Sequence, residues 1–125
     1  MKVLLSIKPE YVEAIISGTK RFEYRKSIFK QKDIDSIVVY ATKPFGKVVG
    51  EFFIEEILED DPKTIWDMTY SYAGVTKDFF LDYFKDREKG FAIKIKEFIE
   101  YEDPMDISEI NSKTKTAPQS FCYIE

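Results

Sequence analysis

A long strand with a glycine inside it is the feature that most constrains how this chain can fold. Residues 46–59, GKVVGEFFIEEILE, are rich in the β-branched and aromatic residues that strands favour. Gly50 interrupts the run, and a glycine within a strand indicates a bulge, a bend or a close approach of another backbone segment. Long strands bent at a glycine form the corners of small closed barrels. The segment therefore favours a curved, barrel-like sheet.

Other segments supply the remaining strands and three helices. Strand patterns occur at residues 2–7, 20–26, 36–42, 90–101 and 118–124. Pro104 is expected to end the strand at 90–101. Pro9 suits the first turn of a short helix, and Gly18 suits its end. Asp61 and Thr76 are expected to cap two further helices.

The order of these elements predicts the fold class. Strands and helices do not alternate regularly, as a parallel sheet requires. We therefore expect an α+β fold with a small, mainly antiparallel β-barrel, one helix after the first strand and a helical pair inserted after the fourth strand. Residues 1–125 are expected to form a single domain with its own core. An aromatic stripe in the last of the three helices is expected to belong to that core, because it has helical spacing: Phe79, Phe80, Tyr83 and Phe84.

Composition excludes several kinds of site. The chain has no histidine and one cysteine, Cys122, so a Ser-His-Asp triad, a Cys-His pair and an imidazole zinc site are impossible within it. The acidic clusters at residues 55–56 and 59–61 lack the spacing of a calcium loop. We expect no metal site and no cofactor. The N-terminal MKVLLSI is too short for a signal peptide, and no apolar run approaches a membrane span, so a cytoplasmic location is expected.

Charge is divided unevenly along the chain. Residues 1–50 carry a net charge of +5 and residues 51–125 a net charge of −9. A basic half permits a local face that binds anions, although the whole chain is acidic. The alternatives are two solvated faces of opposite sign, or an acidic C-terminal half that binds another protein.

The stretch SGTKRFEYRKS (17–27) contains the most promising site residues. In a strand, Phe22 and Tyr24 would face the core and Glu23 and Arg25 the opposite side. Lys20 could bind a phosphate, and Arg25 could form a fork to a phosphate or a base edge. Glu23 could accept a hydrogen bond from an exocyclic amine, or act as a base if burial raised its pKa. The alternative is a structural row of ion pairs that contributes little.

Other polar residues are weaker candidates. Lys8 precedes a helix, where a bound anion would suit it, although it could be an ordinary loop lysine. Glu51 could be a second carboxylate at the site or an outward strand residue. Four further residues could contact a base by stacking or hydrogen bonding, or could be structural: Tyr40, Thr42, Gln119 and Ser120.

The order of several short motifs resembles the ASCH domains, which belong to the PUA-like superfamily. The motifs are SIKPEYVEAIISGTKRFEYRK, VVYATKP, VVGEF and PQSF, and together they extend over nearly the whole chain. The most specific part is the GxKxxExR core formed by Gly18, Lys20, Glu23 and Arg25. The family resemblance implies a small β-barrel related to the RNA-binding domain of pseudouridine synthases and archaeosine transglycosylases.

The resemblance also implies recognition of a nucleic acid or nucleotide in a cleft beside the first helix. Some bacterial members are amidohydrolases that deacetylate acetylcytidine, and others have been linked to RNA cleavage. In the amidohydrolases a lysine acts with a threonine three residues later and a distal glutamate. Lys20 matches the lysine, Glu23 occupies the threonine position, and no carboxylate lies near Tyr72 or Ala73, where the glutamate is expected.

Two functions are therefore expected, in order of preference. The first is a recognition or regulatory module that binds RNA or a modified nucleotide in a small basic cleft. Its expected ligand-binding residues are Lys8, Lys20, Glu23, Arg25, Tyr40, Thr42, Gln119 and Ser120. The second is a hydrolase acting on acetylcytidine or on RNA, with Lys20 and either Glu23 or Glu51 as its acid/base pair.

Overall fold

The computed structural model describes residues 1–110, 116–118 and 120–124. Its strands are β1 (Lys2–Ile7), β2 (Phe22–Arg25), β3 (Ser36–Ala41), β4 (Lys47–Asp60), β5 (Gly90–Met105) and β6 (Phe121–Ile124). Its helices are α1 (Pro9–Ser17), α2 (Pro62–Thr69), the short 3₁₀ helix η1 (Tyr70–Tyr72), α3 (Lys77–Tyr83) and α4 (Ile107–Ile110). Among the described residues, no helix combines the length and the apolar character needed to cross a membrane.

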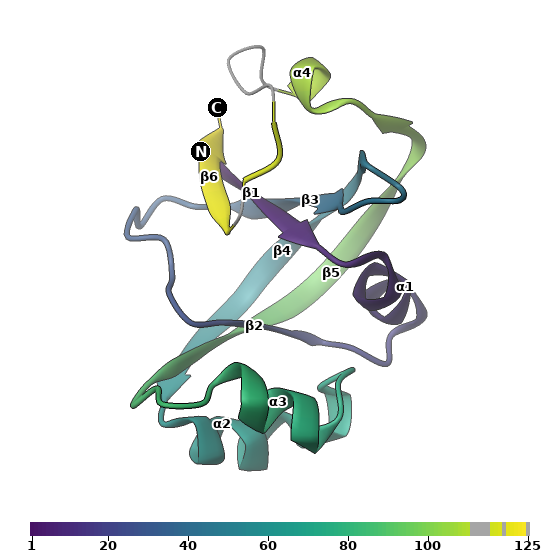
Figure 1. Ribbon diagram of the computed structural model, residues 1–125. Helices are drawn as coiled ribbons and strands as arrows, with labels where there is room; N and C mark the ends of the chain where they lie inside the picture. The colour runs from purple at the N-terminus through teal and green to yellow at the C-terminus, as the bar shows by residue number, and fades with distance from the viewer. Residues whose placement is uncertain (111–115, 119, 125) are drawn as a thin grey trace.

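The six strands form one sheet in the order β2-β5-β4-β3-β1-β6. All neighbouring pairs are antiparallel except β1 and β3, which are parallel. The long strands β4 and β5 extend from the end of the molecule that holds the chain termini to the end that holds the helical pair (Figure 1). The expected α+β class, the single helix after the first strand and the helical pair after the fourth are therefore confirmed.

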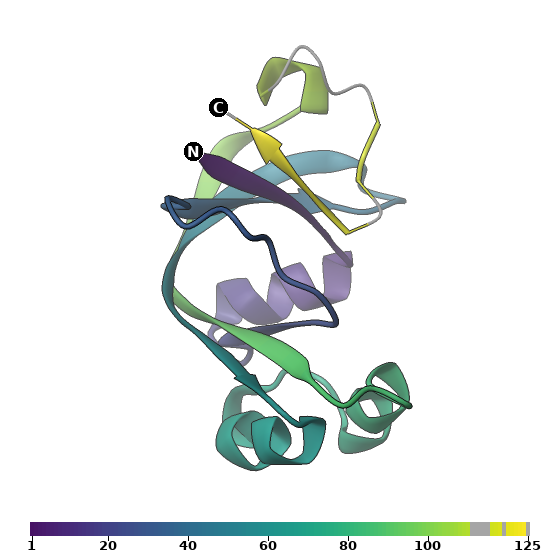
Figure 2. The same ribbon diagram turned by 90° about the vertical axis from the view of Figure 1, so that its left-hand side faces the viewer.

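The sheet curves strongly but does not close. Within the described part of the chain, the edge strands β2 and β6 each pair with one neighbour and not with each other, so "barrel" describes the sheet only loosely. Helix α1 lies on the concave side of the curve (Figure 2). Its Val12 and Ile15 are buried against residues of β1, β3, β4 and β5, which form the main core.

Gly50 lies where the pairing of β4 is irregular. The register shifts between Val48 and Gly50 on the β5 side. A Cβ atom at position 50 would collide with the Ile99 carbonyl oxygen and the Phe98 ring. A close approach of the neighbouring strand therefore requires the glycine.

The expectation that Pro104 ends the fifth strand is wrong. Strand β5 continues through Pro104 to Met105. Val48 pairs with Met105 and Gly50 with Glu100, so Pro104 falls in the register shift between these two pairs. A proline, which lacks a backbone N–H, is tolerated where the ladder is interrupted.

The helical pair covers one face of the short strand β2. Asp61 caps α2 by accepting from the Thr64 N–H, and Thr76 caps α3 by accepting from the Phe79 N–H, both at 3.1 Å. Phe22 and Tyr24 pack with Phe80 and other residues of this pair in a second core cluster. The predicted inward direction of these two rings is therefore confirmed, and the opposite face of β2 points towards α1.

Candidate functional site

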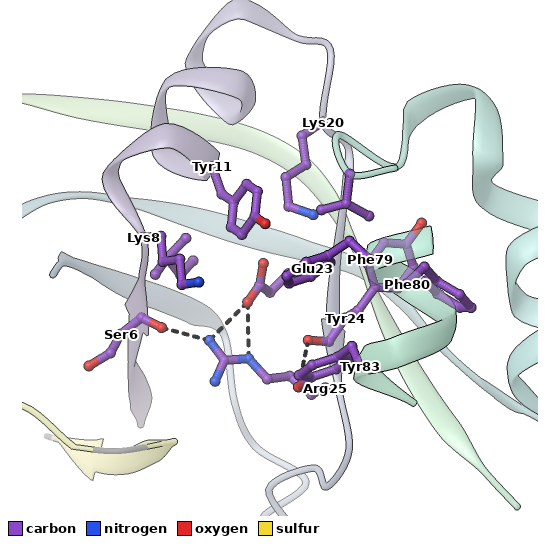
Figure 3. A pocket seen from close by; sticks show the side chains of 12 residues that line it. Ser6, Lys8, Tyr11, Lys20, Glu23, Tyr24, Arg25, Phe79, Phe80 and Tyr83 are labelled. Carbon is purple, nitrogen blue, oxygen red and sulfur yellow. Dashed lines mark hydrogen bonds and ion pairs between the residues drawn. The ribbon is translucent and has the colours of Figure 1, made fainter. Parts of the chain in front are cut away.

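A pocket of about 450 Å³ opens between α1, β2 and α3. Lys8 and Tyr11 line it from the α1 side, and Phe79 and Tyr83 line it from α3 (Figure 3). The complete lining is Ser6, Ile7, Lys8, Tyr11, Lys20, Glu23, Tyr24, Arg25, Val75, Phe79, Phe80 and Tyr83. Its volume lies in the range of small-ligand sites, which is roughly 300–1,000 Å³.

Lys20 is buried at the wall of this pocket, with 2% of its surface exposed. Its Nζ donates to the Ala73 carbonyl oxygen at 2.8 Å and lies over the Tyr24 ring at 4.8 Å and the Tyr11 ring at 5.4 Å. Desolvation lowers the pKa of Lys20, although the Glu23 charge opposes this effect. Lys20 can therefore release a proton more readily than a lysine in water.

Gly74 makes room for Lys20. The glycine has a φ of +67°, and a Cβ at this position would overlap the aliphatic stem of Lys20. Any other residue would be strained by the backbone conformation and would also displace the lysine. The loop between η1 and α3 thus positions Lys20 by close packing.

Glu23 and Arg25 form a buried ion pair, with 7% and 9% of their surfaces exposed. Arg25 Nε and Nη2 contact Glu23 Oε2 at 3.0 and 2.8 Å. Arg25 Nη2 also donates to the Ser6 carbonyl oxygen at 2.9 Å, and Nη1 to the Ser120 carbonyl oxygen at 3.3 Å. All three nitrogens of the guanidinium group therefore contact protein oxygens, so Arg25 holds Glu23 in place and offers no free fork to a ligand.

The second carboxylate oxygen of Glu23 points towards the side of the pocket that holds Tyr11 and Lys20 (Figure 3). The pocket thus brings together a hydrogen-bond acceptor and the Lys20 ammonium group. Burial, helped by the charges of Glu10 and Glu23, raises the pKa of Tyr11, so its hydroxyl keeps its proton. Three cationic side chains line the pocket against one carboxylate, which favours an anionic ligand.

Of the other predicted site residues, Lys8 reaches the pocket, whereas Tyr40 and Thr42 do not. Lys8 is exposed at the pocket, with its Nζ 5.8 Å from the centre of the Phe79 ring. Tyr40 packs against a separate core cluster, and Thr42 lies in the turn after β3, so neither lines the pocket. Among the described contacts, the Ser120 carbonyl oxygen accepts from Arg25. Gln119 lies outside the described residues.

Glu51 does not reach the pocket. Its Oε2 accepts from Lys2 Nζ at 3.0 Å and from Ser36 Oγ at 2.9 Å, and its Oε1 accepts from the Tyr101 hydroxyl at 3.1 Å. These bonds join β1, β3, β4 and β5, and they hold the pKa of Glu51 below its usual value although burial acts in the opposite direction. Glu51 is therefore a structural residue, and its expected role as a catalytic acid is not supported by its position.

Glu51→Ala is expected to lower the free energy of unfolding by about 1–3 kcal/mol near neutral pH, because three donors lose their acceptor. The lowered pKa means that the Glu51 carboxylate stabilises the fold above its ordinary value of 4.5. This contribution disappears as the pH falls through the lowered value, so the variant and the wild type should converge in acid. Urea unfolding across the acid range measures this.

Glu55→Ala is the matched control, because Glu55 is exposed and, among the described residues, forms an ion pair with half-buried Lys94 alone. It should not change stability measurably. Equal losses for the two variants would contradict the structural role of Glu51.

Several pocket residues carry no direct signal in the sequence. Tyr11, Val75 and Tyr83 come from three segments that only the packed fold brings together. One signal was available, since the aromatic stripe brings four rings into one short segment, at positions 79, 80, 83 and 84. Phe80 and Phe84 are buried, whereas Phe79 is 39% exposed, so the expectation that the whole stripe is core is wrong. Within the described ranges, no cluster of three potential metal-ligating side chains occurs.

Comparison with known proteins places these observations in a family. A family model described as "ASCH domain" matches residues 5–105. The "ASCH domain-containing ribonuclease" of Zymomonas mobilis is 31% identical over 96 residues, which cover 77% of this chain and 65% of that protein. The "Large ribosomal subunit protein uL22" of Ureaplasma parvum is 27% identical over 126 residues, covering 98% of this chain and 39% of that protein. The chain thus spans less than two thirds of the length of these relatives.

Structural similarity extends further along the chain. The crystal structure of the ASCH protein from Zymomonas mobilis superposes with a TM-score of 0.88 at 28% sequence identity. The match covers 99% of this chain and 87% of that one. The fold described above is therefore shared with a solved ASCH protein over nearly its whole length.

Proposed function

This chain belongs to the ASCH domain family, and on that premise we propose that it binds RNA and holds one nucleotide of that RNA in the pocket around Lys20 and Glu23. The observation that carries the proposal is the buried Lys20 beside Glu23, in a nucleotide-sized pocket walled by aromatic rings. Lysine and aromatic side chains suit the phosphate and the base of a nucleotide. The relatives named as a ribonuclease and as a ribosomal protein support an RNA ligand. We also propose that the protein acts in the cytoplasm.

Binding is tested with labelled single-stranded RNA, structured RNA and free nucleosides, including acetylcytidine, at low and high salt. Single-stranded RNA should bind, and its affinity should fall as salt rises, because lysines displace counterions from phosphates. Absence of binding to every RNA at low salt would refute the proposal. Deacetylation of acetylcytidine in the same reactions would instead identify an amidohydrolase.

Lys8→Ala is expected to weaken RNA binding by about three- to tenfold and to reduce the salt slope by about one, because one phosphate contact is lost. Lys8 is exposed at the pocket, so the fold should be unaffected. Lys63→Ala is the matched control, since Lys63 is an exposed lysine in α2 that does not line the pocket. Fluorescence anisotropy titrations at several salt concentrations measure both effects. An unchanged slope for Lys8→Ala would remove Lys8 from the interface.

Cleavage of the bound RNA is the second candidate function. It is favoured by the lowered pKa of Lys20, which suits this lysine to act as a general acid or base, and by the relative named as a ribonuclease. In this scheme Glu23 would accept the proton of the hydroxyl group that attacks the phosphorus atom. Lys20 would give a proton to the oxygen that leaves as the phosphodiester bond breaks. Arg25 would act as a positioning residue that fixes Glu23.

A further inference from the structure

Helix α3 presents part of its aromatic stripe to solvent at the pocket. The Phe79 and Tyr83 rings are nearly parallel, with an interplanar angle of 8° and centres 6.2 Å apart. Phe79 is 39% exposed and Tyr83 is half-buried, and both line the pocket. Figure 3 shows them on the side formed by α3, opposite Lys8 and Tyr11. Core packing alone does not explain why these two rings are partly exposed at the pocket.

A lysine accompanies each of these two rings. Lys8 Nζ lies 5.8 Å from the centre of the Phe79 ring, and Lys26 Nζ lies 4.7 Å from the centre of the Tyr83 ring. Both lysines are exposed, and neither forms an ion pair with any described residue. They come from separate segments, one before α1 and one after β2. Two cations thus lie beside two aromatic rings along the length of α3.

The two acidic residues of α3 do not lie on the side of the helix that carries the Phe79 and Tyr83 rings. Asp78 and Asp82 each precede one of the two aromatic residues, so a helical step of about 100° separates them from the rings. A polyanion would be repelled from the side of the helix that carries Asp78 and Asp82 and attracted to the side that faces the two lysines.

We propose that the α3 edge of the pocket, formed by Phe79 and Tyr83 with Lys8 and the neighbouring Lys26, is a second subsite that binds the nucleotide next to the one held at Lys20 and Glu23. The inference rests on the proposed function and deepens it. The ligand class becomes a single-stranded RNA segment of at least two nucleotides. Bases stack on aromatic rings while lysines contact phosphates, and the bases of a duplex are not free to do so.

The test measures affinity for a mononucleotide and for single-stranded oligonucleotides of increasing length. The wild type should gain about 5- to 150-fold in affinity on going from one nucleotide to two or more, which is the effect of one stacked base. Phe79→Ala should lose most of this gain. Lys26→Ala should reduce oligonucleotide affinity about three- to tenfold and leave mononucleotide affinity unchanged, because Lys26 does not line the pocket.

Leu81→Ala is the matched control on the same helix. Leu81 is 47% exposed and lies about 200° around the helix from Phe79, so its loss should not alter the gain. Phe79→Tyr, which keeps an aromatic face, should retain the gain and thereby separates stacking from a folding defect.

The outcomes separate the two levels of the proposal. If no RNA of any length binds, the proposed function itself fails. If oligonucleotides bind no better than a mononucleotide, or if Phe79→Ala and Lys26→Ala both keep the full gain, the second subsite is overturned. Duplex RNA that binds as tightly as the single strand would also overturn it.

Discussion

In the proposed RNA cleavage reaction, Lys20→Met is expected to lower the rate by at least about 100-fold, while RNA binding weakens by no more than about tenfold. Methionine keeps most of the volume of the lysine stem and removes the ammonium group. Loss of a positioned general acid or base typically lowers a rate by 10²–10⁴-fold. In the proposed complex, several groups that line the pocket contact the RNA, including Lys8 and the aromatic side chains, so one charge should matter less to binding.

The pH dependence of the rate identifies the role of Lys20. If Lys20 gives its proton to the leaving oxygen, the wild-type rate should fall as the pH rises through its pKa, which burial lowers from 10.5. This limb of the pH profile should be absent from the residual activity of Lys20→Met. Single-turnover cleavage across the neutral and alkaline range, with thermal unfolding as the check on folding, measures this.

The control for Lys20 is Lys94→Met. Lys94 lies on β5 and pairs with Glu55 at the surface, away from the pocket, so its replacement should leave cleavage unchanged. Cleavage at the wild-type rate by Lys20→Met would exclude Lys20 from the chemistry. A wild type that binds RNA without any product would make this protein a recognition module.

Arg25→Met is expected to lower the free energy of unfolding by about 3–5 kcal/mol. The substitution leaves the Glu23 carboxylate buried without its partner, and breaking a buried ion pair from one side has an effect of this size. The Ser6 and Ser120 carbonyl oxygens also lose their donor. Urea unfolding near neutral pH measures the change.

The double variant Glu23→Gln/Arg25→Met provides the control, because it removes both charges together. It should recover a substantial part of the stability that Arg25→Met loses, and the coupling energy follows from the double-mutant cycle. A loss below about 1 kcal/mol for Arg25→Met would show that the pair behaves like an exposed one.

Local sequence signals were sufficient for most of the fold. Apolar runs, β-branched residues and alternation predicted the strands. Asp61 and Thr76 predicted the starts of the helical pair, because capping depends on neighbours three residues away. Closure of the sheet depends on how its two edges meet in space, and no local pattern describes that. The expectation that residues 1–125 form a single domain stays a prediction.

The site was predictable only in part, for the same reason. The motif around β2 identified Lys20, Glu23 and Arg25, and the structure brings these residues into one pocket. Strand alternation placed Glu23 and Arg25 on one face but could not show that they bind each other. The partner of Lys20, the Ala73 carbonyl oxygen, is 53 residues away in sequence. Tyr40 lies in the VVYATKP motif and Glu51 in the VVGEF motif, and the registers of β3 and β4 direct both side chains away from the pocket.

The contacts of Arg25 have a consequence for how this protein can change. Arg25, on the edge strand β2, donates hydrogen bonds to a carbonyl oxygen near the end of β1 and to that of the residue before β6, the other edge strand. These bonds connect the two edges of the open sheet, which do not pair with each other. The same side chain holds Glu23 at the pocket. A substitution of Arg25, whether by mutational drift or by engineering, would therefore destabilise the whole fold along with the position of Glu23. New ligand specificities should arise first on the α3 side of the pocket, where a substitution leaves the hydrogen bonds of Arg25 intact.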